Sequence, residues 1–297
     1  MTGLIACDWG TTNLRAWRLD GEGRIVARRE FPLGVSRLPP GQAEAVFESQ
    51  VRPSLAGEGL PAILCGMIGS NLGWTAAGYV DCPADLGALA CGVARPAPGV
   101  AIVPGLRCAG LSGPDVMRGE ETQVLGWLAA DPARRRGWRV LCLPGTHAKW
   151  VAVADGVVAR FATAMTGELF DLLTTHSVLR APAAAHDMSA FSLGVAVVGD
   201  GSALASRLFS ARGRFLAGEL PESAMASYLS GLLIGAEIGA LWPRMRVEGD
   251  DSVEVIGDPA LTRLYAHALA LRKIKVRATD GEGAALEGLK AIWRQAA

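Results

Sequence analysis

Short apolar segments separated by polar, glycine-containing turns fill the first part of the chain. Residues 4–7 form an uninterrupted apolar run, and residues 14–19 alternate imperfectly between apolar side chains and arginine. Asp20-Gly21-Glu22-Gly23 has the composition of a hairpin turn, and residues 24–29 lead back from it. This pattern predicts strand, turn, strand, turn and strand at the start of the protein.

A second stretch near the middle of the chain has the same pattern. Residues 140–143 are apolar, and Pro144-Gly145-Thr146-His147 forms the expected turn. Residues 149–154 alternate less cleanly, and residues 157–161 return after a further turn. We therefore expect a second meander of three strands here.

The two stretches can be laid over each other without a gap. Gly10-Thr11 then matches Gly145-Thr146, and Asp20-Gly21 matches Asp155-Gly156 at one constant offset. The match predicts an internal duplication, with two related domains that each carry a hairpin ending in Gly-Thr.

The rest of the chain predicts a mixed α/β protein. Helices are expected over residues 42–51, 120–130, most of 182–241, and 283–297, and strands over 62–65, 253–256 and 273–277. Two Pro/Gly-rich patches, 96–105 and 110–114, loosen the chain before its second half. We place the domains at residues 1–115 and 116–297, and the last helix is a candidate to pack back on the first domain.

Acidic and basic residues balance, with 29 of each and a formal net charge of zero. Such a chain lacks the basic surface with which proteins bind nucleic acid. Half of the residues are hydrophobic, and 297 residues suffice for two cores. We therefore expect a small-molecule ligand held by a local site, and no nucleic-acid partner.

The six cysteines lie mostly in apolar runs and form no C-x-x-C pair. They are interpreted as small buried side chains in a reducing compartment, and no His/Cys cluster suggests zinc. The chain does not start with a basic segment followed by a long apolar stretch, as a secretory leader would. The apolar run 229–241 carries Glu237 and is too short to span a membrane. We expect a cytoplasmic protein with no membrane partner, and a homodimer is left open.

The first turn carries residue types that suit a nucleotide phosphate. Asp8 ends a buried strand and can hold Mg²⁺ through water, while Arg15 adds positive charge near the phosphates or the acceptor. The turn between them offers backbone N–H groups, a permissive glycine and hydroxyls: Gly10, Thr11, Thr12 and Asn13. The alternative is an ordinary hairpin capped by Asp8.

The second turn is a candidate for a matching phosphate contact. Gly145 and Thr146 repeat the first tip, and His147 and Lys149 are candidates to stabilise the transferred charge. The alternative is a surface turn with a solvated Lys149. Trp150 is expected in the core.

Two further segments are candidates for the acceptor site. Arg118-Gly119-Glu120-Glu121 starts a helix, and either Glu120 or Glu121 could take the proton of a sugar hydroxyl, although first-turn acids also favour the helix dipole. The glycine-rich loop 66–74 follows a strand and offers Ser70, Asn71 and Trp74, and its alternative is a tightly packed helix entry. Arg118 is a further candidate for contact with the substrate.

These segments, in this order, resemble the 2-dehydro-3-deoxygalactonokinase family of the actin, hexokinase and heat-shock-chaperone ATPase superfamily. The resemblance rests on residues 8–15, 66–74, 118–126, 144–150 and 166–173. It implies two ribonuclease H-like domains, each with a mixed five-stranded sheet flanked by helices, and an ATP cleft between them. It also implies Mg²⁺-ATP-dependent phosphorylation of 2-dehydro-3-deoxy-D-galactonate on its 6-hydroxyl in D-galactonate catabolism.

By this similarity, residues 8–15 form the first phosphate motif and residues 145–149 the second. Gly257, Asp258 and Pro259 would lie near adenosine. Related sugar kinases usually have aspartate where this chain has Glu120-Glu121, so the base is not assigned to either residue.

Two rival functions remain at this point. One is a kinase of the same fold for another sugar or sugar acid. The other is a non-enzymatic nucleotide-binding sensor on the actin-like fold, which would bind ATP without acceptor-stimulated release of ADP.

Overall fold

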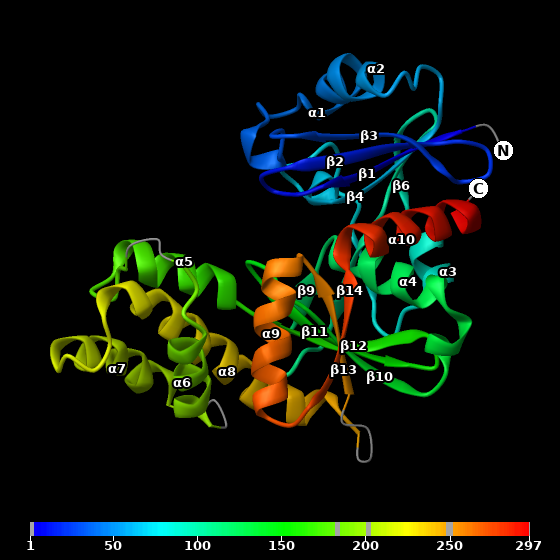
Figure 1. The fold of residues 1–297 in the computed structure, drawn as a ribbon. Helices are drawn as coiled ribbons and strands as arrows, with labels where there is room; N and C mark the ends of the chain where they lie inside the picture. Colours follow the sequence, from blue (N-terminus) through cyan, green and yellow to red (C-terminus); the bar gives the residue numbers. More distant parts are fainter. Residues whose placement is uncertain (1–2, 182–184, 200–202, 248–251, 297) are drawn as a thin grey trace. The chain divides into compact units, whose positions relative to one another are not determined.

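The protein is a mixed α/β structure whose sheets are flanked by helices (Figure 1). The structure, a computed structural model, describes residues 3–181, 185–199, 203–247 and 252–296. Its contacts divide the chain into two compact units. Unit 1 comprises Met1–Gly137, Val153–Arg160 and Gly281–Ala297, and unit 2 comprises Trp138–Ala152 and Phe161–Asp280.

The first sheet has the strand order β3-β2-β1-β4-β7-β6. Its strands are β1 (Leu4–Trp9), β2 (Leu14–Leu19), β3 (Ile25–Phe31), β4 (Ala62–Gly66), β6 (Ala94–Ala97) and β7 (Val100–Ile102). The first three form the predicted antiparallel meander, and β1, β4 and β7 run parallel. This sheet has one strand more than expected, because the chain turns at Pro98-Gly99, where Gly99 has a φ of +74°, and adds β6 at the edge.

Helices cover both faces of this sheet. A continuous helical segment packs Phe47 and Val51 onto Ile5, Cys7 and Trp9 of β1. It comprises α1 (Ala43–Val46), the π-helical turn Phe47–Val51 and α2 (Arg52–Ser54), close to the predicted 42–51. The C-terminal helix α10 (Gly281–Ala296) contacts β1 and β4, and Figure 1 shows it on the opposite side of the strands.

The second sheet repeats the topology of the first. Its order is β12-β11-β10-β13-β14, from β10 (Trp138–Leu143), β11 (Ala148–Ala154), β12 (Val157–Ala164), β13 (Ser252–Gly257) and β14 (Lys275–Asp280). The pairs β10–β13 and β13–β14 are parallel, as are β1–β4 and β4–β7. The internal duplication that the Gly-Thr and Asp-Gly matches predicted is therefore confirmed at the level of strand order.

A small three-stranded sheet was not predicted. It consists of β5 (Tyr79–Asp81), β8 (Gly105–Cys108) and β9 (Asp115–Met117). The strands are only three or four residues long, and β8 and β9 adjoin the Pro/Gly-rich patches, so their sequences carry too little alternation to reveal them. The helix α3 (Leu86–Cys91) was missed for the same reason, and Cys91 at its end is exposed, contrary to the expectation of buried cysteines.

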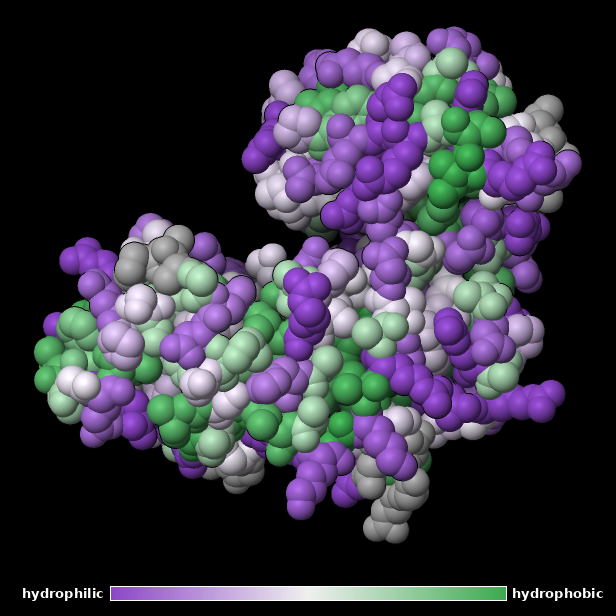
Figure 2. Space-filling view, viewed as in Figure 1, coloured by the Kyte–Doolittle hydropathy of each residue, from purple (hydrophilic) through white to green (hydrophobic). Residues whose placement is uncertain are grey.

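The predicted helical region lies largely in unit 2. The predicted range 182–241 contains α6 (Met188–Val198), α7 (Leu204–Leu216) and most of α8 (Met225–Met245). Two further helices of unit 2, α5 (Thr166–His176) and α9 (Pro259–Leu271), lie outside that range, and α4 (Glu120–Ala130) belongs to unit 1. Part of the predicted range, 182–184 and 200–202, lies outside the described residues. The surface of the helical part of unit 2 mixes apolar and polar side chains (Figure 2). Phe209 and Leu216 of α7 are among the exposed apolar residues.

The helix α8 is longer than the apolar run seen in the sequence. The segment Glu222–Met245 is long and apolar enough to cross a membrane, but 78% of its most apolar window is buried inside the structure. A Cβ atom on Gly231 would lie 2.0 Å from the Phe191 carbonyl oxygen of α6. Close helix packing through glycine therefore explains the burial, and core helices of this kind pass the same length test.

Candidate active site

Asp8 lies at the end of β1, where two neighbouring strands bring polar groups to it. Arg15 is its partner across the β1–β2 hairpin and Cys65 its partner on β4. An Arg15 guanidinium nitrogen lies 3.7 Å from Asp8 Oδ2, and the Cys65 thiol donates to Oδ1 at 3.8 Å. Burial raises the pKa of Asp8, the Arg15 charge opposes this, and the nearby Glu120 charge adds to it. The side chain stays 20% exposed, so a cation could reach it.

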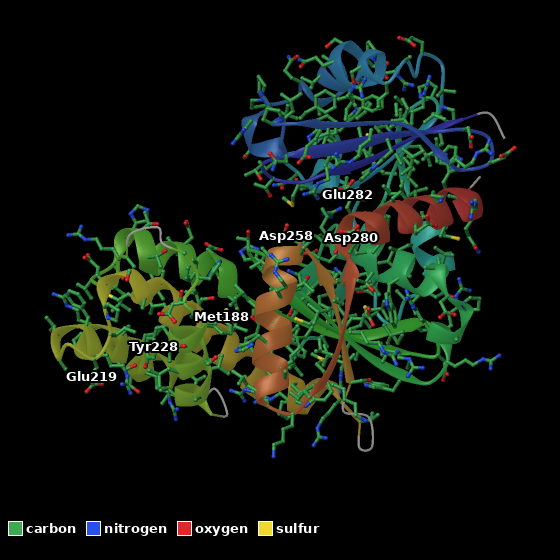
Figure 3. All side chains as sticks on the ribbon, viewed as in Figure 1. Met188, Glu219, Tyr228, Asp258, Asp280 and Glu282 are labelled. Atoms are coloured by element: carbon green, nitrogen blue, oxygen red, sulfur yellow. The ribbon has the colours of Figure 1, made fainter. Side chains whose placement is uncertain are left out.

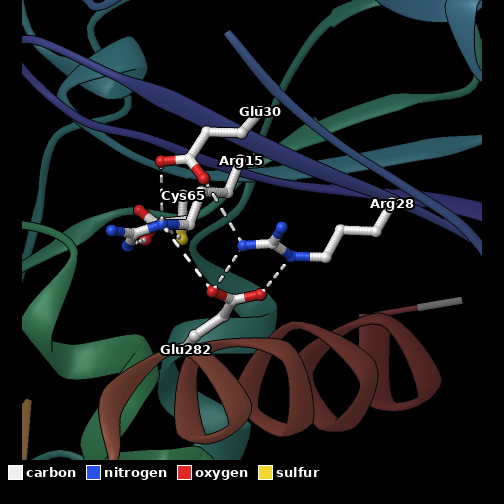
Figure 4. A network of polar contacts seen from close by, with 6 residues as sticks. Arg15, Arg28, Glu30, Cys65 and Glu282 are labelled. Carbon is white, nitrogen blue, oxygen red and sulfur yellow. Dashed lines mark hydrogen bonds and ion pairs between the residues drawn. The ribbon is translucent and has the colours of Figure 1, made fainter. Parts of the chain in front are cut away.

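Arg15 lies among three carboxylates without a close bond to any of them (Figure 4). Its Nε atom is 3.8 Å from Glu30 and 3.9 Å from Glu282, the second residue of α10. Arg28 instead makes the close contacts with Glu282, donating from Nε at 2.6 Å and from Nη2 at 2.8 Å. These bonds lower the pKa of Glu282. The loose contacts leave Arg15 able to bind an additional anionic group.

The turn of the first hairpin has a fixed backbone and exposed side chains. Gly10 N–H donates to the Asn13 carbonyl at 2.9 Å, and Gly34 N–H donates to the Thr12 carbonyl at 2.9 Å. Ser36 binds the Thr11 carbonyl through both its N–H and its hydroxyl. The side chains of residues 11–13 are exposed. The four predicted phosphate-binding residues are thus held in one turn that a ligand can reach.

The adjacent carboxylates Glu120 and Glu121 have different environments. Glu121 is 0% exposed and accepts hydrogen bonds from Gly119 N–H at 2.6 Å and from the Thr122 hydroxyl at 3.0 Å. Burial, with the neighbouring Glu120 charge, raises its pKa to about 8. Glu120 is half-buried, accepts from Arg118 N–H at 3.1 Å and acts electrostatically on Asp8. Of the two, only Glu120 combines access with a place near Asp8.

The side chains of the predicted acceptor loop differ in their accessibility to a ligand. The Ser70 hydroxyl donates to the Met67 carbonyl at 2.7 Å and accepts from Leu72 N–H, so it closes the turn. Asn71 is exposed. Trp74 packs against Phe47 with ring centroids 5.6 Å apart and is only partly buried. Substrate contact by Ser70, Asn71 and Trp74 stays a prediction, and Asn71 is the most accessible of them.

Arg118 lies over the ring of Tyr79, with its guanidinium carbon 4.5 Å from the ring centre. Its Nη2 donates to the Gly78 carbonyl at 2.8 Å. Its Nε and Nη1 atoms are buried and have no hydrogen-bond partner within the part of the chain that the structure describes. Unpaired buried donors are costly, so these two N–H groups could donate to a polar ligand group if the loop beside them moves.

In unit 2, the turn between β10 and β11 is held by the first turn of α5. Glu168 N–H donates to the Thr146 carbonyl at 3.0 Å, and its carboxylate lies 2.5 Å from His147 Nε2. The chain packs closely here, since a Cβ atom on Gly167 would lie 2.5 Å from the Gly145 carbonyl oxygen. The side chains of Thr146 and His147 are exposed. Gly145, Thr146 and His147 thus form one accessible turn against a helix N-terminus, which favours anions.

Lys149 does not lie in solvent. Its side chain is 4% exposed, and its ammonium group donates to the His147 carbonyl at 3.0 Å, so it supports the turn from beneath. The alternative of a solvated Lys149 is therefore wrong. Its predicted role at the transferred phosphoryl group remains a prediction, because a direct contact would require this side chain to leave its buried place.

The segment Gly257-Asp258-Pro259 joins β13 to α9. Asp258 is the N-cap of α9 and accepts from Ala260 N–H at 2.8 Å and Leu261 N–H at 3.3 Å (Figure 3). A Cβ atom on Gly257 would lie 3.5 Å from Pro144, so the segment lies beside the second turn. The structure gives Asp258 a capping role, and contact with adenosine stays a prediction.

Comparison with known proteins decides the family. A model of the family described as 2-keto-3-deoxy-galactonokinase matches residues 8–292. The chain belongs to this family. It is 40% identical, over 97% of both chains, to a Rhizobium meliloti (strain 1021) protein named as a probable 2-dehydro-3-deoxygalactonokinase. It is 34% identical to the 2-dehydro-3-deoxygalactonokinase of Escherichia coli (strain K12), covering 97% of this chain and 96% of the relative.

Solved structures agree with this family and its fold. A crystal structure from Sinorhizobium meliloti, of a protein assigned as a 2-dehydro-3-deoxygalactonokinase, matches with a TM-score of 0.86 and 37% identity, covering 98% of each chain. The Clostridium difficile activator of 2-hydroxyisocaproyl-CoA dehydratase, solved with bound ADPNP, matches with a TM-score of 0.52 and 14% identity over 99% of this chain and 96% of that chain. The second likeness concerns the fold alone. Together they support the actin-like ATPase fold of this kinase family.

Several polar residues of the candidate site were not predicted from sequence. Glu30 could have been found, because the register of the predicted hairpin pairs it with Arg15. Arg28 and Glu282 could not, because their contact joins residues 254 positions apart. Among the described residues, no group of three or more His, Cys, Asp or Glu side chains is placed to hold a metal by itself.

Proposed function

We propose that the protein transfers the γ-phosphoryl group of ATP to the 6-hydroxyl of 2-dehydro-3-deoxy-D-galactonate. The product would be 2-dehydro-3-deoxy-6-phospho-D-galactonate, formed in the breakdown of D-galactonate in the cytoplasm. Membership of the kinase family supports the reaction. The observation in the site that carries the proposal is the accessible Asp8 carboxylate at the end of a buried strand, with Arg15 and Glu120 close to it.

Asp8 and the two turns supply the proposed contacts with nucleotide. The residue type and exposure of Asp8 fit Mg²⁺, which prefers one or two carboxylates together with phosphate oxygens and water. When bound, the ion would neutralise charge on the transferring phosphoryl group. Backbone N–H groups and hydroxyls of residues 10–13 in unit 1, and of residues 145–147 in unit 2, would donate to phosphate oxygens. Residues 257–259 would contact adenosine.

Glu120 is the proposed general base. It would accept the proton of the acceptor hydroxyl as that oxygen attacks phosphorus. Glu121 is less suited, because it has no exposed surface and both of its oxygens already accept hydrogen bonds within the helix start. Its proposed task is to hold Gly119 and Thr122 so that Glu120 faces Asp8.

Arg15 and Arg118 are the residues that we propose to bind the substrate carboxylate. Arg15 has three loose carboxylate contacts at 3.7 to 3.9 Å, and an incoming carboxylate could bind it closely. Arg118 has two unpaired buried N–H donors within the described residues. A sugar acid would therefore be preferred to the corresponding neutral sugar.

A coupled assay of ADP release tests the proposal. The protein would be incubated with Mg²⁺-ATP and a panel containing 2-dehydro-3-deoxygalactonate, its C4 epimer, other sugar acids, and neutral sugars including the reduced alcohol. We expect acceptor-stimulated ADP release with the 2-dehydro-3-deoxy acids and its loss in Asp8→Asn. The control variant Asp81→Asn changes an exposed carboxylate that pairs with Arg107 and should retain activity. Tight ATP binding without acceptor-stimulated ADP release would favour a sensor instead.

A further inference from the structure

One carboxylate lies inside the helical part of unit 2, in an otherwise apolar stretch of α8. Glu237 is 5% exposed, and its flanking residues Ala236 and Ile238 belong to the buried hydrophobic set. A buried carboxylate is costly unless its oxygens are well bonded, so its presence requires a physical explanation. Its pKa is raised by burial, and hydrogen bonds from its neighbours oppose this rise.

Three donors from three different elements converge on this carboxylate. Trp150 Nε1 of β11 donates to Oε1 at 2.7 Å. The Tyr265 hydroxyl of α9 donates to Oε2 at 2.8 Å, and the Thr166 hydroxyl at the start of α5 donates to the same oxygen. All three bonds are buried. The side chain thus connects α8 with a strand and two helices at one point.

Two of these elements hold the second turn directly. Trp150 follows Lys149, whose ammonium group supports the His147 carbonyl from below. Thr166 precedes Gly167 and Glu168, which contact Gly145, Thr146 and His147. A displacement of β11 or of the first turn of α5 would therefore move the turn that we propose to bind phosphate.

The third element carries the other proposed nucleotide contact. Tyr265 lies on α9, which begins at Pro259 with Asp258 as its cap. A Cβ atom on Gly257, just before this cap, would lie 3.5 Å from Pro144 Cδ. The hydroxyl of Tyr265 fixes α9 against the carboxylate that also holds β11 and α5.

We propose that Glu237 is a positioning residue for the segments of unit 2 to which we assign nucleotide binding. It aligns the turn 145–147, the first turn of α5 and the start of α9 through Trp150, Thr166 and Tyr265. The proposal rests on the proposed kinase function, because it assigns ATP as the ligand of these segments. Binding sites depend on such support, since a small displacement of a ligand-contacting group can cost much of its effect.

Single-hydroxyl variants provide the test. Tyr265→Phe and Thr166→Val each remove one donor to Glu237 and keep the size of the side chain. The matched control is Tyr228→Phe, which removes another buried tyrosine hydroxyl of unit 2, bonded to Ser210 at 2.7 Å and placed on α8 (Figure 3). The KM for ATP, the KM for the sugar acid, kcat and the melting temperature would be measured for each.

We expect Tyr265→Phe and Thr166→Val to raise the KM for ATP about tenfold, with the KM for the sugar acid changed by less than about twofold. Tyr228→Phe should leave both values unchanged, even if its melting temperature falls by a similar amount. Glu237→Gln should rescue function relative to Glu237→Leu, because the amide oxygen can still accept from Trp150 and both hydroxyls can accept from the amide N–H groups.

Equal melting temperatures in Tyr265→Phe and Tyr228→Phe, with no rise in the KM for ATP, would overturn the positioning role and leave Glu237 a structural residue. Calorimetric titration with ADP separates this result from failure of the proposed function. If the wild-type protein binds ADP but phosphorylates no sugar acid, the kinase proposal fails, and a weaker ADP affinity in Tyr265→Phe still supports the role of Glu237. If the wild-type protein binds no ADP, both proposals fail.

Discussion

Glu120 and Glu121 are adjacent in the chain, but only Glu120 is accessible to a ligand. The sequence could place both at a helix start and could not separate them, because burial depends on which way each side chain leaves the helix. In the structure, Glu121 turns into the protein and accepts from Gly119 and Thr122. Ser70 shows the same limit, because its suitable hydroxyl closes a local turn. Residue type alone did not reveal the structural roles of Glu121 and Ser70.

The two glutamates should therefore differ in catalysis. Glu120→Gln is expected to lower kcat by about 10² to 10⁴, the usual contribution of a general base. Glu121→Gln should keep kcat within about tenfold of the wild-type value, because its amide can still bind the helix start. Steady-state rates of sugar-acid-dependent ADP release would measure both. Equal losses in the two variants would contradict the assignment of the base to Glu120.

The buried Glu121 should also make stability depend on pH. Its pKa is raised in the folded protein from 4.5 to about 8, so its contribution is fully present below about pH 4.5 and is lost as the pH rises through 8. Each pH unit in this window should cost up to about 1.4 kcal/mol. Urea unfolding from pH 5 to 9 should show this loss in the wild-type protein and a reduced loss in Glu121→Gln. Parallel pH profiles would exclude the effect.

At the scale of secondary-structure elements, close packing places the start of α5 against the second turn. The positions of the glycines in the sequence do not reveal this contact, because Gly167 is equally compatible with the capping sequence of an ordinary helix start. The structure shows that no side chain fits there: a Cβ atom on Gly167 would lie 2.8 Å from Thr146 Cα as well as close to the Gly145 carbonyl. The helix and the turn therefore move together.

Gly167→Ala should weaken ATP use by forcing α5 away from the turn. We expect kcat/KM for ATP to fall about tenfold or more, because the displaced backbone belongs to the proposed phosphate contacts. Gly213→Ala is a matched control in the helix α7, since its added Cβ meets no described atom within 4 Å. Alanine is also the better helix former there, so the control should not lose stability. Equal kinetics for both variants would contradict a role for the α5 contact.

At the scale of the whole molecule, the sequence predicted the repeated part of the fold well. The two meanders, the helix at 120–130 and the strand-turn-helix around residue 257 occur where their apolar periodicity and turns indicated. The three-stranded sheet and the edge strand β6 were missed, since short strands next to proline and glycine lack a measurable period. Contacts between the two ends of the chain, such as Arg28 with Glu282, also leave no local signal.

The C-terminal helix should be indispensable for unit 1. Leu286, Leu289 and Ile292 of α10 are buried, each worth about 2 kcal/mol, which is a large part of the 5–15 kcal/mol that stabilises a typical domain. A chain ending at Asp280 is expected to lose protection from hydrogen exchange in β1 and β4. The full-length control Glu282→Gln removes an ion pair near the start of α10 and should keep that protection. Wild-type exchange in the shortened chain would contradict the prediction.

The place of α10 in unit 1 has a consequence for how the protein is made. The strands β1 and β4 leave the ribosome before α10, the helix that contacts both of them. Domains commonly fold from the N-terminus while synthesis continues. Here β1 and β4 lack their covering helix until residues 281–296 have been translated. A chain released before residues 281–296 are made therefore cannot contain a complete first unit, however much of the preceding sequence it already holds.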